Sequence, residues 1–316
     1  MVISLRSGVT LGGLAALAFL PPLTGWFDQP YYLDIAMRMM CLAIAAVSLN
    51  LILGFGGMVS FGHAVFIGIG AYGVGIPAFY GNYSGFIQIP LAMAAAALFA
   101  LITGAICLRT RGVYFIMITL AFAQMAFFAL VSIEEYGGDD GLVIDTRSEF
   151  GGLIDIEQTA TLYYLILVTL IGSLYLVRRI VASRFGRVIR GAKSNDERAQ
   201  AIGFDSYKYR LTCYVISGAL CGLAGALLGN FTGFISPDMM DWTRSGELIF
   251  MVVLGGAGSI FGPVLGAAAF LILEEFLSSL TIHWQIIFGP LLILMVLYGR
   301  GGIDGLLGGR AGDRNG

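Results

Sequence analysis

Long apolar segments alternate with short charged clusters along the whole chain. Most of the apolar runs approach or exceed the roughly 20 residues that a helix needs to cross about 30 Å of hydrocarbon. The pattern therefore predicts an all-α polytopic membrane protein. The runs that are nearly free of charge are Leu11–Leu20, Ile35–Leu53, Ile87–Leu108, Val113–Ile133, Thr159–Val177, Leu211–Leu228, Leu248–Leu273 and Ile286–Tyr298.

Divided at its polar and glycine-rich positions, the chain is predicted to cross the membrane about ten times. The eighth crossing is the weakest, because only Glu247–Leu254 precedes a glycine-rich interruption. It is either a full span or a half-helix, so nine and eleven crossings remain alternatives. The predicted crossings are 8–26, 33–54, 58–80, 86–108, 112–133, 159–178, 210–229, 243–258, 262–281 and 284–299.

Lysine and arginine residues are distributed unequally between the two predicted faces. Of the eighteen, only Arg38, Arg147 and Arg244 fall outside when the N-terminus is placed inside, which leaves fifteen on the inner side. The positive-inside rule then predicts that both termini are cytoplasmic, in a bacterial-type inner membrane. Pro21-Pro22 follows the first apolar run without a small-x-small cleavage site, so that run is interpreted as a retained helix.

Composition narrows the function class. Charged residues are 12% of the chain, against about 25% in a soluble domain, and 316 residues divided among spans leave no room for a soluble catalytic domain. The 45 glycines indicate close helix packing, because small residues let backbones approach in a membrane. A net charge of −2 gives no indication of nucleic-acid binding. The cysteines have no metal-ligand spacing, so neither a metal site nor an enzyme is predicted.

The segment 134–158 is predicted to be an external acidic loop. A solvated loop and a docking surface for an external partner are both compatible with its charge. Its carboxylates belong to Glu134, Glu135, Asp139, Asp140, Asp145, Glu149, Asp155 and Glu157.

Two glycine-rich interruptions resemble each other, at Gly54–His63 and Gly255–Pro263. Each contains Gly-Gly followed shortly by a serine, and each precedes a helix rich in small residues. Paired interruptions are typical of internal repeats in transporters, where substrate passes near the broken helices. Two tight cytoplasmic turns are the alternative. The candidate residues of the translocation path are Gly56, Gly57, Ser60, Gly62, His63, Gly255, Gly256, Ser259 and Gly262.

Ionisable residues within the predicted spans are scarce. Arg38, Glu274 and His283 lie near span ends, where long side chains reach the interface. His63 is either a polar residue that lines the path or a packing residue. Ion-coupled pumps usually carry carboxylates in the middle of their spans, so the sequence argues against ion coupling.

The segment 182–207 is predicted to be a cytoplasmic coupling loop. Ser194 and Glu197 form a capping-box pattern for a helix of about two turns that ends at Gly203. Such a helix is marginal in water, so either this chain's helix ends or a cytoplasmic partner must hold it. The candidate coupling residues are Ser194, Asn195, Glu197, Arg198, Ala199, Ile202, Gly203 and Phe204.

Ala199 and Ile202 lie three residues apart, so they are expected to share one helix face that Phe204 extends. This small apolar knob would suit a groove on an ATPase. Gly186–Ser194 resembles a phosphate loop only superficially, since it lacks Gly-Lys-Ser and no buried strand precedes it. No cofactor is therefore expected on this chain, and ATP would bind to partner subunits.

Several segments together resemble one family. They are similar to the permeases of high-affinity branched-chain amino acid importers of the ATP-binding cassette class, in particular the LivM type. Two departures, His63 where the family often has glutamine and the acidic loop 134–158, leave the substrate open. The resemblance covers roughly residues 30–305, and it rests on Leu49–Ala64, Gly68–Tyr72, Leu108–Phe115, Thr119–Phe122, Asn195–Phe204 and Leu254–Pro263.

The resemblance implies one membrane permease domain over residues 1–316 and a set of partners. These are a second homologous permease subunit, two cytoplasmic ATPases, an external substrate-binding protein and membrane lipid. A sugar-type or urea/amide permease of the same superfamily, an ion-coupled secondary transporter and a membrane scaffold remain alternatives.

Overall fold

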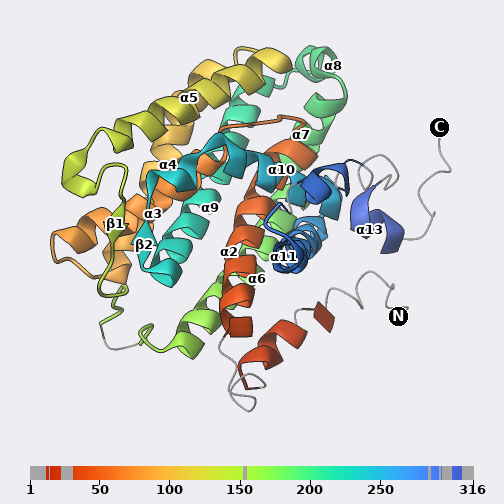
Figure 1. The fold of residues 1–316 in the computed structure, drawn as a ribbon. Coiled ribbons are helices and arrows are strands. Elements are labelled where there is room, and N and C mark those ends of the chain that lie inside the picture. Colours follow the sequence, from red (N-terminus) through yellow and green to blue (C-terminus); the bar gives the residue numbers. More distant parts are fainter. Residues whose placement is uncertain are drawn as a thin grey trace.

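The computed structural model of the chain describes residues 12–13, 15–22, 31–151, 155–283, 286–291, 293 and 301–307. Within them the chain is mostly helical, as the apolar pattern predicts (Figure 1). In chain order the elements are α2 (Tyr31–Asn50), η1 (Leu51–Phe55), α3 (Ala64–Phe79), α4 (Gly85–Cys107), α5 (Val113–Val131), η2 (Glu134–Tyr136), β1 (Leu142–Val143), α6 (Thr159–Ala182), α7 (Arg184–Ser194), α8 (Asp196–Ala201), α9 (Ser206–Thr232), β2 (Phe234–Ile235), η3 (Pro237–Met240), α10 (Trp242–Gly255), α11 (Gly262–Leu280) and α13 (Gly302–Leu307).

Six of the described helical stretches are long and apolar enough to cross a membrane, namely α2 with η1, α4, α5, α6, α9 and α11. They confirm a polytopic α-helical membrane protein. The helix α3 is apolar but has 16 residues. About half of each of the predicted crossings 8–26 and 284–299 lies outside the described residues. Ten crossings and cytoplasmic termini therefore stay predictions.

The predicted eighth crossing, 243–258, corresponds to the short helix α10. This helix has 14 residues, or about 21 Å at 1.5 Å per residue, which is less than the hydrocarbon thickness. It starts at Trp242, whose backbone N–H donates to the carboxylate of Asp241 (2.8 Å). Its length fits the half-helix alternative better than a full span.

The helix α2 runs through the middle of the bundle, where it packs against α6, α9, α10 and α11 (Figure 1). Most of its side chains are buried. The helix α5 lies at the periphery, since its buried residues are Phe115, Thr119 and Ala123, which are four apart and share one face. Exposed side chains such as Met117, Met125 and Phe128 cover its opposite face, as expected for a helix in contact with lipid.

Small residues let α3, α4 and α9 approach closely. A Cβ on Gly70 would lie 2.0 Å from the carbonyl oxygen of Gly222, and a Cβ on Gly225 would lie 1.9 Å from that of Ile67. The helix α9 approaches α4 as closely, because a Cβ on Gly222 would lie 2.5 Å from the Ala96 methyl group of α4. The high glycine content therefore serves backbone packing, as small residues do in membrane bundles.

The acidic segment 134–158 is held against the end of α9. Its strand β1 pairs antiparallel with β2, which directly follows α9. The Arg147 guanidinium donates to the carbonyl oxygens of Ile156 (3.2 Å) and Glu157 (3.0 Å). The segment thus lies at the end of α9 opposite to α8, and its role as a docking surface stays a prediction.

Candidate functional site

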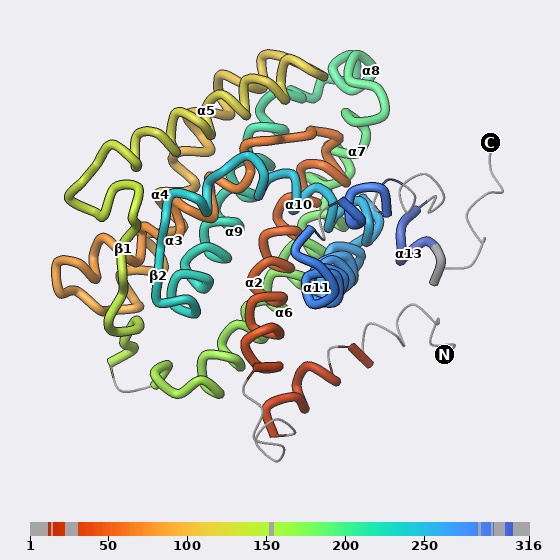
Figure 2. Tube along the Cα trace, in the orientation of Figure 1, coloured from red at the N-terminus to blue at the C-terminus, as the bar shows by residue number. Residues whose placement is uncertain are grey.

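The first glycine break begins with a change of helix type at the end of α2. The hydrogen-bond pattern becomes π-helical over Leu51–Phe55, and Gly57 then has φ of +70°. Residues 56–63 cross to the start of α3 outside any regular helix or strand (Figure 2). The break carries Ser60 and His63 into the bundle, where both are fully buried.

Side chains of other helices satisfy the backbone of this break. The N–H of Phe61 donates to Thr119 Oγ1 of α5 (3.3 Å), and the N–H of Ala64 donates to Ser245 Oγ of α10 (3.0 Å). Irregular backbone at membrane depth persists where protein groups replace water as partners. The irregular conformation of the break is therefore stabilised by hydrogen bonds from α5 and α10.

The second break joins α10 to α11. Gly256 has φ of +115° and Gly258 has φ of +85°, a backbone region that side-chain-bearing residues rarely adopt. The Ser259 hydroxyl accepts a hydrogen bond from the N–H of Gly262, the first residue of α11 (3.1 Å). The chain turns so tightly that a Cβ on Gly255 would lie 1.8 Å from the Gly262 carbonyl oxygen.

Asn50 joins the two breaks. Its Nδ2 donates to the Ser259 carbonyl oxygen (2.6 Å), and its Oδ1 accepts from the N–H of Gly258 (2.9 Å). A Cβ on Gly54 would lie 2.4 Å from the Gly258 nitrogen. We call Asn50, Gly54, Gly258 and Ser259 the break junction. Sequence reasoning paired the two breaks but missed Asn50, whose amide at the end of an apolar run is the signal that could have found it.

Lys193 connects the coupling segment to the break junction. It lies in the last turn of α7, and its Nζ donates to the carbonyl oxygen of Gly54 (2.7 Å). Its side-chain stem packs beside the first break, because a Cβ on Gly57 would lie 2.9 Å from Lys193 Cγ. A single charged side chain thus joins the 182–207 segment to the meeting point of both breaks.

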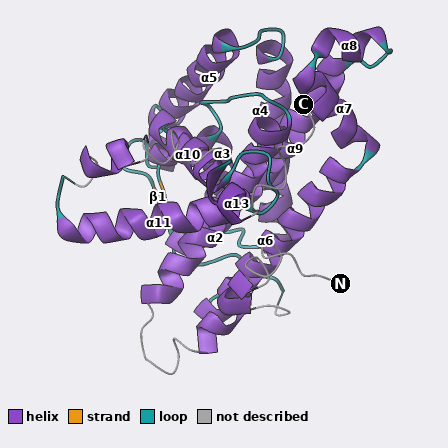
Figure 3. Cartoon of the chain, turned by 90° about the vertical axis from the view of Figure 1, so that its right-hand side faces the viewer, coloured by secondary structure: helices purple, strands orange, loops and turns teal. Residues whose placement is uncertain are grey.

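The coupling segment contains two helices, α7 and α8, instead of one short helix between loops (Figure 3). Ser183 caps α7, because its hydroxyl accepts from the N–H of Gly186 (3.3 Å). Gly186, Ile189 and Ala192 are three apart and form a buried face against the bundle. The prediction of a loop before Ser194 was wrong, since this buried face outweighs the low helix propensity of glycine.

The predicted capping box is displaced by one residue. Ser194 is the last residue of α7, and Asn195 caps α8 with its Oδ1, which accepts from the N–H of Arg198 (2.8 Å). The backbone of Asn195 is extended, as a cap between two helices requires. Glu197 lies in the first turn of α8, where its negative charge interacts favourably with the positive end of the helix dipole.

The helix α8 stops just before Gly203, as predicted from the glycine. Gly203 has φ of +93°, and its N–H donates to the Gln200 carbonyl oxygen (2.9 Å). The N–H of Phe204 reaches back to the carbonyl oxygen of Ala199 (3.1 Å). These two bonds form a Schellman motif, in which glycine supplies the left-handed residue.

The prediction that Ala199, Ile202 and Phe204 form one exposed apolar knob is wrong for Ala199. Ala199 is buried by this chain, whereas Ile202 is 68% exposed and Phe204 is 39% exposed. A groove of about 700 Å³ runs beside them, and Arg184 and Arg187 contribute to its walls. Because a charge at Ala199 would disturb the segment itself, Ile202 is the position at which contact with a partner can be tested.

The start of α8 is anchored by two arginines. Asp196 forms ion pairs with Arg111, which precedes α5, and with Arg210 of α9 (3.4 Å). Arg210 also donates to the Ala192 carbonyl oxygen (3.1 Å). Asp196 is mostly shielded, and a partly buried ion pair with further hydrogen bonds holds its geometry better than an exposed one. The chain's own helix ends therefore hold α8, one of the two predicted alternatives.

Asp205 closes the segment by capping α9. The side chain of Lys208 (3.1 Å) and its backbone N–H (3.3 Å) both contact the Asp205 carboxylate. These hydrogen bonds lower the pKa of Asp205 below its ordinary value. The cap is exposed to solvent, so its contribution to stability is small.

His63 lies inside the bundle among α2, α3 and α9. Its Nε2 is 3.0 Å from Ser48 Oγ and 3.5 Å from Ser217 Oγ, and its ring packs edge-on against Phe66. In this conformation the histidine contacts side chains on these three helices. In the part of the chain that the structure describes, no group of three or more His, Cys, Asp or Glu residues could hold a metal ion.

Comparison with known proteins gives one consistent family. The family model "Branched-chain amino acid transport system / permease component" matches residues 31–297. The permease LivM of the high-affinity branched-chain amino acid transport system of Escherichia coli K12 is 29% identical over 84% of this chain and 68% of the relative. LivH of the same system is 32% identical over 44% of this chain and 46% of its own length. The xylose permease XylH of E. coli K12 is 28% identical over 46% of this chain and 38% of its own. No solved structure matches the chain significantly.

Proposed function

This chain belongs to the branched-chain amino acid transport permease family, and we propose that it is one of two membrane subunits that form the translocation path of an importer for these amino acids. As a member of this family it is an integral membrane transport protein and not an enzyme. The match over residues 31–297 carries the proposal, because it includes both breaks and the coupling segment. The second permease subunit would be homologous to this one.

The coupling segment would be the contact for two cytoplasmic ATPases, which would bind the ATP. Two features support this role. Ile202 and Phe204 expose apolar surface beside a groove with arginine walls, and Lys193 joins the same segment to Gly54. A movement imposed on α8 by a docked ATPase would therefore reach both helix breaks, as alternating access requires. An external binding protein would deliver substrate at the opposite end, near 134–158.

The same arrangement supports the proposed orientation. The C-terminal end of α2, the start of α9 and the basic coupling segment meet at one end of the bundle, and the positive-inside rule assigns such an end to the cytoplasm. The acidic segment 134–158 at the opposite end of α9 would then face the exterior.

Cysteine labelling tests this orientation. In a variant without reactive native cysteines, an impermeant maleimide added to intact cells should modify Asp140→Cys. It should leave Asn195→Cys unmodified until the cells are opened. Both positions lie outside the membrane spans, so access to the reagent decides the result. The reverse pattern would contradict both the orientation and the ATPase-docking role.

The energy source tests the function itself. The complete importer in proteoliposomes, with its ATPases and binding protein, should take up L-leucine only when ATP is present on the ATPase side. Dissipating the proton and sodium gradients should leave uptake close to its initial rate, because ATP hydrolysis on the partner subunits would supply the energy. Uptake by this chain alone along an ion gradient would support a secondary transporter instead.

A sugar permease is the second candidate, favoured by the similarity to the xylose permease over 46% of this chain. Competition of D-xylose with L-leucine in the uptake assay distinguishes the two. Urea and short amides are tested in the same way. We expect competition from valine and isoleucine and none from xylose.

A further inference from the structure

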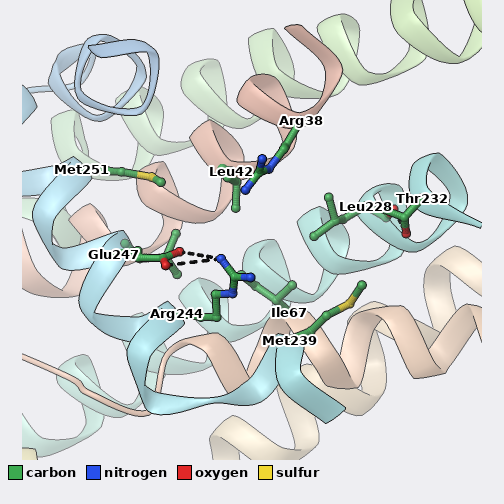
Figure 4. Close-up of a pocket in the computed structure, with 10 residues that line it drawn as sticks. Arg38, Leu42, Ile67, Leu228, Thr232, Met239, Arg244, Glu247 and Met251 are labelled. Atoms are coloured by element: carbon green, nitrogen blue, oxygen red, sulfur yellow. Dashed lines mark hydrogen bonds and ion pairs between the residues drawn. The ribbon is translucent and has the colours of Figure 1, made fainter. Parts of the chain in front are cut away.

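A small cavity lies among α2, α3, α9 and α10, away from the coupling segment (Figure 4). It encloses about 170 Å³, which is less than the roughly 300–1,000 Å³ of pockets for drug-sized ligands. Arg38 of α2 lies 12 residues before Asn50, or about 18 Å along the helix. The cavity is therefore separate from the break junction, on the same side of the molecule as the acidic segment.

Two ion pairs flank this cavity. Arg244 Nη1 is 2.9 Å from Glu247 Oε2, and Arg38 Nη2 is 3.4 Å from Glu274 Oε1. Figure 4 shows the two guanidinium groups reaching the cavity from opposite sides, from α2 and α10. Two positive and two negative groups give this cluster a net charge of zero. Charged side chains within membrane helices are costly to desolvate, and in membrane proteins they mark substrate pathways.

The sequence predicts that Arg38 reaches the membrane interface near a span end. In the structure its guanidinium turns to Glu274 of α11 and to the cavity. The pairing joins residues on the first and last described spans, so no local pattern in the sequence could indicate it.

Apart from Thr232, the rest of the lining is apolar. Leu42, Ile67, Leu228 and Met251 form apolar walls from four different elements. Thr232 is the neutral polar side chain in the lining, and its hydroxyl is within hydrogen-bond distance of two carbonyl oxygens of its own chain. A sugar needs several neutral hydrogen-bonding groups around its ring, and this lining does not supply them.

We propose that this cavity is a binding site for a zwitterionic aliphatic amino acid on its way through the membrane subunit. The guanidinium groups of Arg38 and Arg244 would bind the α-carboxylate, and Glu247 would bind the α-ammonium. The branched side chain would pack against the aliphatic walls. A zwitterion leaves the neutral cluster balanced, whereas an anion or an amine adds one unpaired charge in a partly desolvated site.

This proposal rests on the proposed function and adds the site and substrate class within this subunit. The helix α10 gives the cavity a connection to the breaks. Glu247 lies in its first half, Met251 in its second, and Gly255 ends it at the second break. A ligand held by Arg244 and Glu247 would therefore rest on the helix that leads directly to the break junction.

Direct binding to the purified importer, with its ATPases and without the external binding protein, tests the site. Labelled L-leucine should bind, and 4-methylpentanoate, isoamylamine and D-xylose should compete at least about tenfold more weakly than unlabelled L-leucine. Glu247→Gln should weaken L-leucine binding at least about tenfold, since the negative charge that pairs with the ammonium group is lost and only a neutral amide oxygen remains. It should strengthen rather than weaken the binding of 4-methylpentanoate, because the variant cluster carries one net positive charge that this anion balances.

A second variant covers the case in which Glu247→Gln disturbs folding. Leu228→Trp fills the cavity and keeps all four charges, and it should abolish L-leucine binding. Leu176→Trp makes the same change on an exposed face of α6 and should bind L-leucine like the wild type.

Normal binding by both cavity variants, or competition by xylose as strong as by leucine, overturns the site. If the variants bind and transport leucine normally, the importer function stands while the cavity proposal fails. A complete importer that takes up no branched-chain amino acid refutes the proposed function as well.

Discussion

Replacing Lys193 with methionine should uncouple ATP hydrolysis from transport while the ATPases stay bound. Methionine keeps an apolar stem beside Gly57 but removes the donor to the Gly54 carbonyl oxygen, 2.7 Å away. A hydrogen bond from a charged group contributes about 1.5–3 kcal/mol, so leucine uptake per ATP hydrolysed should fall by about ten- to a hundredfold. Uptake and hydrolysis are measured together on the complete importer in proteoliposomes.

Two further variants separate coupling from docking. Lys208→Met removes an exposed charge on neighbouring α9 and should keep wild-type coupling. Ile202→Asp places a charge on the exposed apolar surface of the coupling segment and should reduce co-purification of the ATPases. Ala201→Asp, on the same helix and also exposed, should not. Wild-type coupling in Lys193→Met would show that the contact with Gly54 transmits nothing.

The membrane class of the fold could be predicted because it depends on the length of apolar runs. A run such as Thr159–Val177 has one stable state in lipid, a helix that satisfies its own backbone, and α6 forms there. The glycine breaks could also be found, since glycine and a following serine mark irregular backbone locally. Their contact could not, because it depends on Asn50 meeting Gly258, 208 residues later.

The coupling segment shows where local reasoning is insufficient. Gly203 ends a helix through its own backbone conformation, so its role was visible in the sequence. The start of α8 was misplaced because Ser194 and Asn195 are both good caps, and the choice depends on where α7 ends. The helix α7 was missed because its stability comes from burying Ile189 and Ala192 against other helices. Ala199 is likewise buried by contacts with residues distant in the sequence, which no local pattern indicates.

Gly54→Ala should abolish transport and destabilise the protein. The new methyl group would lie 2.0 Å from Asn50 Oδ1 and 2.4 Å from the Gly258 nitrogen. Neither neighbour can move freely, because Asn50 holds the second break by two hydrogen bonds. The added methyl group would overpack the contact, which costs about 1–3 kcal/mol of stability. If the two breaks move apart, the two hydrogen bonds of Asn50 are lost as well, at about 1 kcal/mol each. The melting temperature in detergent should therefore fall by several degrees.

Gly172→Ala is the matched control for this change. It makes the same substitution within α6, where no atom lies within 4 Å of the added methyl group. Alanine is a better helix former than glycine by about 1 kcal/mol, so this variant should melt at or slightly above the wild-type temperature and transport normally. Equal melting temperatures and equal uptake for the two variants would mean that the two breaks do not interlock at Gly54. If Gly54→Ala is stable but takes up no substrate, the close contact is needed only for the transport cycle. The methyl group would then block the movement of the breaks without weakening the resting fold.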